Sequence, residues 1–110
     1  MLFRSGGGAT LARLMYDASE REAMSLFDRA VRLAPGNVAV RYQIALSLAG
    51  FDAEKYHARI TSELTAAVSG TAQTAYEKKI QGRAQELLGL MTPAAHDEFD
   101  SLVRKYQGFP

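Results

Sequence analysis

Apolar residues recur at steps of three and four positions along most of the chain, which is the period of an amphipathic α-helix. The pattern is clearest after Ser19, where Glu22 follows three residues later and completes a capping-box pattern at a helix N-terminus. Pro35 and Gly36 end this stretch, because proline lacks the amide that would continue a helix, and Asn37 can cap the next helix. The apolar positions of this stretch are Ala23, Leu26, Phe27, Ala30, Val31 and Ala34.

The same period predicts five further helices joined by short turns. We expect them over residues 9–16, 38–50, 53–68, 71–90 and 94–106, the fourth beginning at either Thr71 or Thr74. A turn at residues 17–19 separates the first of these from the helix that Ser19 opens. No stretch shows the period-two alternation typical of strands. The sequence therefore predicts an all-α fold of six helices in three antiparallel hairpins.

The first eight residues differ from the rest, because Gly6, Gly7 and Gly8 cannot nucleate a helix. We expect residues 1–8 to form a flexible glycine-rich arm and residues 9–110 to form a single helical domain. A phosphate-binding loop would need a lysine directly after its glycines, and no lysine precedes Lys55. The glycines therefore predict a linker rather than a nucleotide site.

Residues 38–50 form the most apolar helix, with only three polar positions. A helix that is apolar nearly all round must be covered on more than one side. We expect Ile44, Ala45 and Leu48 to face the core, which leaves a second apolar face that the core does not need. Asp52 is the expected cap of the helix that follows.

Composition excludes several classes of function. Lys and Arg number 13 against 12 Asp and Glu, a net charge of +1, whereas nucleic-acid binders carry an excess of basic residues. The chain has no cysteine, so it can form neither a disulfide nor a thiolate metal site. No run approaches the ~18 apolar residues of a membrane span, and the start lacks the apolar segment of a signal peptide. We therefore expect a cytoplasmic protein that binds neither nucleic acid nor membrane.

Candidate chemistry is limited to two histidines, His57 and His96. Neither has a second histidine three or four residues away, and we place them in different hairpins. Glu54 and His57 share one helical face, which gives at most two ligands. The sequence therefore predicts no enzyme, no bound metal and no cofactor.

The order Ala23, Phe27, Ala30 and Pro35 resembles the second helix of a tetratricopeptide (TPR) repeat. The resemblance implies a right-handed stack of helical hairpins that binds proteins in a concave groove. The chain departs from the repeat where Gly7 takes the place of a large aromatic and Arg41 that of a common tryptophan.

Carried onto residues 38–50, the resemblance places the partner-binding groove at Ala39, Tyr42, Leu46 and Ala49. This face carries no charge, so we expect it to bind an apolar peptide or helix, or a second copy of the chain. It can instead be filled by the chain's own last helix or its glycine-rich arm.

Two rival functions stay open. The chain can be an obligate homo-oligomer or a capping piece of a larger repeat protein, since end repeats are atypical. It can also be a small enzyme or ligand-binding bundle with a pocket between hairpins.

Overall fold

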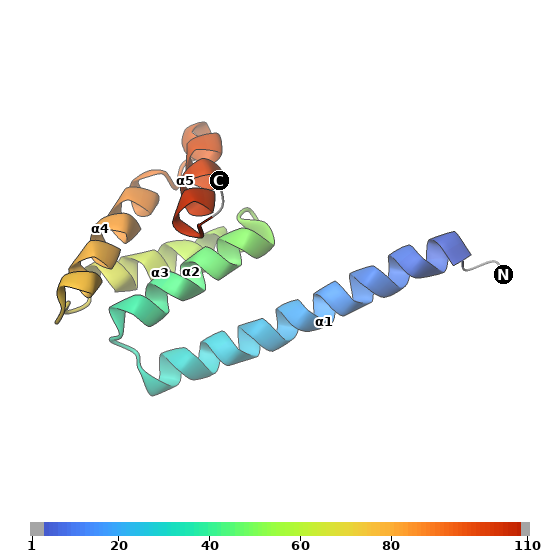
Figure 1. Cartoon of the computed structure of the whole chain (residues 1–110), viewed down its shortest axis with the longest axis horizontal. Coiled ribbons are helices and arrows are strands. Elements are labelled where there is room, and N and C mark those ends of the chain that lie inside the picture. Colours follow the sequence, from blue (N-terminus) through green and yellow to red (C-terminus); the bar gives the residue numbers. More distant parts are fainter. Residues whose placement is uncertain (1–3, 109–110) are drawn as a thin grey trace.

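The computed structural model describes the backbone of residues 4–108 and the side chains of residues 19–108. It is all-helical, and no strand occurs in this part of the chain. Five α-helices and one 3-10 helix follow one another through short connections, as Figure 1 shows. Their bounds are α1 Arg4–Leu33, α2 Val38–Asp52, α3 His57–Ser69, α4 Ala75–Gly89, η1 Pro93–Ala95 and α5 His96–Tyr106. None of these helices is both long enough and apolar enough to cross a bilayer.

The first of the three expected hairpins is a single helix in the structure. α1 runs unbroken for 30 residues and replaces the helix over 9–16, the turn at 17–19 and the helix from Ser19. The turn is absent because residues 17–19 contain no proline or glycine, and Asp or Ser inside a helix costs at most about 0.7 kcal/mol relative to alanine. Ser19 therefore lies within α1, and the predicted capping box with Glu22 was wrong.

The backbone of residues 4–8 also belongs to α1, where we expected a flexible arm, and residues 1–3 lie outside the described residues. A glycine added to an existing helix costs about 1 kcal/mol relative to alanine. Starting a new helix is far more costly, because several residues must be fixed for one hydrogen bond. The glycine triplet therefore continues a helix that the residues after it can nucleate.

α2 lies at the centre of the fold and contacts α1, α3, α4 and α5. The buried side chains form one cluster around it, and the predicted core positions Ile44, Ala45 and Leu48 are confirmed. The cluster consists of Val38, Tyr42, Ile44, Ala45, Leu46 and Leu48 of α2, Ile60, Leu64 and Ala67 of α3, Ile80, Ala84 and Leu87 of α4, and Phe99 and Val103 of α5. The near-continuous apolar sequence of α2 is thus explained by its neighbours on several sides.

Two of the predicted helix caps are present. The Asn37 side chain accepts a hydrogen bond from the Val40 amide at 3.0 Å, and Thr74 accepts one from the Glu77 amide at 3.0 Å. Asp52 was expected to open the next helix, but it ends α2, and its carboxylate accepts from the Lys55 amide at 3.0 Å. Asp52 therefore caps the turn between α2 and α3, and α3 begins four residues later than the expected start at residue 53.

A side chain from α4 caps the C-terminus of α3. The Gln81 amide donates to the carbonyls of Ala67, Val68 and Gly70, three acceptors near the C-terminus of α3 that the helix itself leaves without partners. Gly70 lies against α2, and a β-carbon there would come within 2.9 Å of a Val38 methyl group. The glycine thus allows the close approach of the end of α3 to the start of α2.

α1 packs on the other helices through only its second half. Met24, Phe27 and Val31 are half-buried against the core cluster. Figure 1 shows that the first half of α1 continues past the other helices, and this gives the chain its long dimension of 58 Å against 34 and 24 Å. The molecule is therefore a group of four packed helices with one long helix along its side.

A network of charged side chains, which we call the Glu63 cluster, joins α1, α2 and α3. The Glu63 carboxylate is only 2% exposed and accepts from Arg41 at 2.9 Å and from Arg59 at 2.7 Å. Arg59 also binds Asp28 of α1 at 3.0 Å, and Arg41 donates to the Pro35 carbonyl at 3.0 Å. Burial lowers the pKa of Arg59, but its hydrogen bonds to Glu63 and Asp28 outweigh this and hold the pKa above its usual value.

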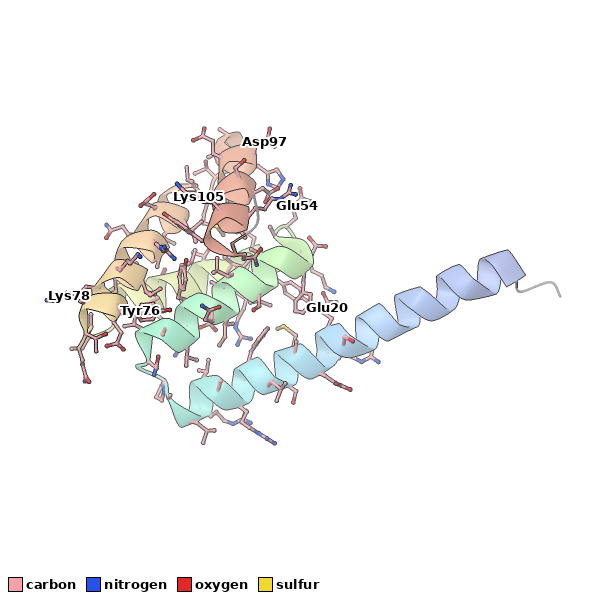
Figure 2. The ribbon with its side chains drawn as sticks, viewed as in Figure 1. Glu20, Glu54, Tyr76, Lys78, Asp97 and Lys105 are labelled. Carbon is pink, nitrogen blue, oxygen red and sulfur yellow. The ribbon has the colours of Figure 1, made fainter. Side chains whose placement is uncertain are left out.

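A second contact, the Glu20 cluster, holds α1 about two turns nearer its N-terminus than Asp28. Glu20 is buried although it is charged, and its carboxylate accepts from Lys55 at 3.3 Å. The Lys55 ammonium also lies 5.1 Å from the centre of the Tyr56 ring. Figure 2 shows Glu20 on the side of α1 that faces the packed helices. Both clusters fix the position of α1 by directional contacts that apolar packing alone would not supply.

Candidate functional site

The binding face predicted on α2 is covered by the chain itself. Tyr42 is 1% exposed and Leu46 is 4% exposed, and both belong to the core cluster, while Ala39 and Ala49 are half-buried. Because α4 and α5 contact α2, they cover the second face that we expected to stay open. The Gln107 amide just after α5 also donates to the Leu46 carbonyl at 3.0 Å. A partner cannot reach Tyr42 or Leu46 in this structure, which corresponds to the alternative that the chain fills the groove with its own last helix.

The hydroxyl group of Tyr42 is an unusual feature of this core. It is buried and has no hydrogen-bond partner at bonding geometry among the described residues. Burial raises the pKa of the hydroxyl above its usual value of 10.0, and the nearby Arg83 charge offsets part of that rise. The Arg83 guanidinium in turn lies 4.7 Å from the centre of the Tyr106 ring on α5. These contacts join α2, α4 and α5 and expose no site.

A concave site lies elsewhere, between the turn that joins α2 to α3 and the connection that joins α4 to α5. It is a hollow of about 380 Å³, which we call the turn hollow. Its lining consists of Ala53, Glu54 and His57 on one side and Leu90, Met91, Thr92, Pro93, His96 and Phe99 on the other. The apolar part of this lining comes mainly from the α4–α5 connection and from Phe99.

Local structure explains why these residues meet. Thr92 and Pro93 start a new helical segment, and η1 turns the chain directly into α5. Phe99 lies on the buried face of α5, so it anchors the connection to the core while it borders the hollow. On the other side of the hollow, the chain turns after Asp52, and His57 is the first residue of α3.

The turn hollow brings together the two histidines that we placed apart. His57 and His96 both line it, each at the first residue of its helix, with Glu54 beside them. His96 Nε2 lies 3.3 Å from Asp100 Oδ2, one helical turn along α5. Among the described residues no group of three or more acidic, histidine or cysteine side chains is arranged to hold a metal ion. The two imidazoles therefore form the polar edge of a mostly apolar depression.

A second hollow of about 430 Å³ borders the first and shares Leu90 with it. Asp97, Glu98 and Lys105 of α5 supply its charged lining. Figure 2 shows Glu54 beside the α2–α3 turn and Asp97 at the start of α5, on the same side of the molecule. Glu54, Asp97 and Glu98 are exposed, and in the described part of the chain none of them forms an ion pair. With these three carboxylates against the single Lys105 ammonium, the edge of the two hollows is acidic on balance.

Comparison with known proteins adds no name to this site: no protein-family model, no curated protein and no solved structure matches the chain. We therefore infer function from the residues and their arrangement alone.

Proposed function

We propose that this chain is a non-catalytic protein-interaction module whose turn hollow receives an apolar side chain of a partner segment. The observation that carries the proposal is the apolar depression between the two helix connections, bordered by unpaired acidic side chains. Concave, mostly apolar sites with a few convergent polar groups are where proteins bind ligands. The helical hairpins and the resemblance to TPR repeats favour a protein partner, although the proposed site differs from the groove that the resemblance implied.

The apolar lining supplies the binding energy in this proposal. Leu90, Met91 and Phe99 offer a surface onto which one aliphatic or aromatic side chain can pack. Burial of about 100 Å² of apolar area contributes roughly 2.5 kcal/mol. Met91 adds adaptability, because a methionine side chain is unbranched and adjusts to different shapes.

The acidic edge selects the partner. Glu54, Asp97 and Glu98 attract a segment in which lysine or arginine flanks the apolar anchor, and they disfavour an acidic one. Because all three are exposed, this selection weakens as salt rises. The proposed partner is therefore a basic amphipathic segment.

A defined pair of peptides tests the proposal. We expect a helical peptide of leucine and lysine to shift the NMR amide signals of residues 53–57 and 90–99, and a matched leucine and glutamate peptide to leave them unchanged. Met91→Ser removes apolar lining without adding a charge and should abolish the shifts while the circular dichroism spectrum stays the same. Glu86→Gln, on the exposed side of α4, is the control and should bind like the original chain.

Equal binding of both peptides, or shifts that persist in Met91→Ser, would show that the turn hollow is not the docking site.

A small apolar ligand is the second candidate occupant. It is favoured by the two imidazoles, since His57 and His96 can orient a small molecule by hydrogen bonds. Screening small apolar acids by the same NMR signals separates the two cases. Binding of such a molecule in the absence of any peptide effect would favour a ligand-binding bundle over a protein-interaction module.

A further inference from the structure

The side of α1 that faces away from the packed helices carries two solvent-exposed leucines. Leu26 is 60% exposed and Leu33 is 78% exposed, and they are two of the three large hydrophobic side chains exposed in the described part of the chain. They lie seven residues apart, so they share one helical face. That face lies away from Phe27 and Val31, which pack on the core. α1 therefore has one face for its own chain and a second apolar face without a neighbour.

Charged residues frame this second face in a complementary order. Glu22 precedes Leu26 by four residues and Arg29 follows it by three, so all three lie on the same side of α1. Both charged residues are exposed, and within the described residues neither forms an ion pair. Glu22, Leu26 and Arg29 thus form a negative, apolar, positive sequence along the face.

We propose that two copies of this chain associate by antiparallel pairing of their α1 helices around Leu26. A two-fold axis near Leu26 places Glu22 of each copy opposite Arg29 of the other, which gives two symmetric ion pairs around a leucine contact. A parallel pair would instead place like charges opposite each other, which is unfavourable. The charge order therefore favours the antiparallel arrangement.

The shape of the molecule leaves space for this pairing. The antiparallel register overlaps residues 18–33 of one copy with the same residues of the other, a contact of about 24 Å at 1.5 Å per residue. In this register, the C-terminal end of each α1, near Leu33, lies beside the start of the projecting half of the other α1. Because α2–α5 pack on the face of α1 away from Leu26, the packed helices of the two copies lie on opposite sides of the paired α1 helices. Figure 1 shows that the first half of α1 extends beyond α2–α5, so these halves form the two ends of the pair.

Charge reversal tests the register. Glu22→Arg and Arg29→Glu, each alone, create like-charge contacts across the axis and should raise the dimer dissociation constant at least about tenfold. The double variant Glu22→Arg with Arg29→Glu should restore it, because the pairs are then reversed. Sedimentation equilibrium from about 1 µM to about 1 mM covers the affinities expected for a small interface. A double variant as weak as the single ones, or a monomer of the original chain at every concentration, would overturn the proposal.

Cross-linking gives a second readout, made simple by the absence of cysteine from the chain. Leu26→Cys should form an intermolecular disulfide with oxidised glutathione, because the two positions face each other at the axis. Ser19→Cys is the matched control: it is exposed and shares the face, but its two copies lie about 20 Å apart in this register.

A disulfide at position 26 and none at position 19 is the expected result. A disulfide at position 19 alone, or equally at both positions, would contradict the register. Neither test depends on the turn hollow, because no residue of that hollow lies on α1.

Discussion

The two parts of this molecule are held in different ways. α2–α5 surround a single apolar cluster that includes fully buried leucines and isoleucines. α1 buries no hydrophobic side chain completely over its described residues and relies on half-buried contacts together with the Glu63 and Glu20 clusters. The difference shows that a helix can be placed by charges that need specific partners, while the core needs only apolar residues at the right spacing.

The largest effect is expected in the apolar core. Leu64 of α3 is fully buried, so Leu64→Ala removes a side chain from the cluster and leaves a cavity. We expect a loss of about 3–5 kcal/mol in the free energy of unfolding, which is a large share of the ~5–15 kcal/mol available to a domain of this size. Urea unfolding followed by circular dichroism measures it. An unchanged midpoint would show that the cluster is not the main source of stability.

The next effect concerns the Glu63 cluster, which links α2 to α3 and reaches α1 through the Arg59–Asp28 pair. Glu63→Gln leaves Arg41 and Arg59 without their shared carboxylate, and we expect a loss of about 2–3 kcal/mol, because breaking a buried ion pair leaves uncompensated charge. Asp28→Asn removes only the exposed end of the network and should cost less than about 1 kcal/mol. If both variants lost the same free energy of unfolding, the cost of Glu63→Gln could not be attributed to the burial of its carboxylate.

A smaller effect is expected from the apolar contacts of α1. Phe27 is half-buried, so Phe27→Ala should cost about 1–2 kcal/mol, less than a fully buried phenylalanine. We expect limited proteolysis to cut α1 faster, while α2–α5 resist. Leu26→Ala, at the neighbouring exposed position, should change stability by less than about 0.5 kcal/mol at micromolar concentration. Equal loss from both variants would contradict the assignment of the two faces of α1.

The smallest effect is expected at Tyr42, whose buried hydroxyl has no partner. Tyr42→Phe removes an unsatisfied polar group and should leave stability at pH 7 unchanged or raise it by up to about 1 kcal/mol. The raised pKa of Tyr42 means that this tyrosine ionises more readily in the unfolded chain. Its contribution to stability is therefore fully present below pH 10 and is lost as the pH rises through its folded pKa.

Thermal unfolding between pH 9 and pH 11 should accordingly show a shallower decline in Tyr42→Phe than in the original chain. A decline of the same slope would assign the alkaline loss to other groups, of which Tyr56 and Tyr106 also have raised pKa values.

Apolar spacing predicted the part of the fold that apolar packing holds together. The stripes on α2–α5 gave helices close to the observed bounds, and Asn37 and Thr74 were identified as caps from local pattern alone. The prediction failed at residues 17–19, where a weak turn signal competes with the low cost of continuing a helix. The residues at 17–19 alone do not show whether the turn or the continued helix has the lower free energy.

The candidate site was harder to foresee because it depends on tertiary contacts. The turn hollow joins residues near position 54 to residues near position 96, and no short pattern relates them. Similarly, Arg59 and Glu63 were detectable as a pair four residues apart, but the burial of Glu63 requires Arg41 from another helix. The face at Tyr42 and Leu46 was expected to be one that the core does not need, but both side chains belong to the core cluster.

Hydrogen exchange tests the central contrast between the two parts most directly. At about 1 µM, where the proposed self-association is weak, the backbone amides of α1 residues 19–33 should exchange through a local opening that leaves α2–α5 protected. Added salt should speed that opening, since it weakens the exposed part of the charged contacts, and should leave the core amides unchanged. Exchange of α1 at the same rate as α2–α5, with no response to salt, would contradict the conclusion that α1 is held less firmly than the core and partly by charge.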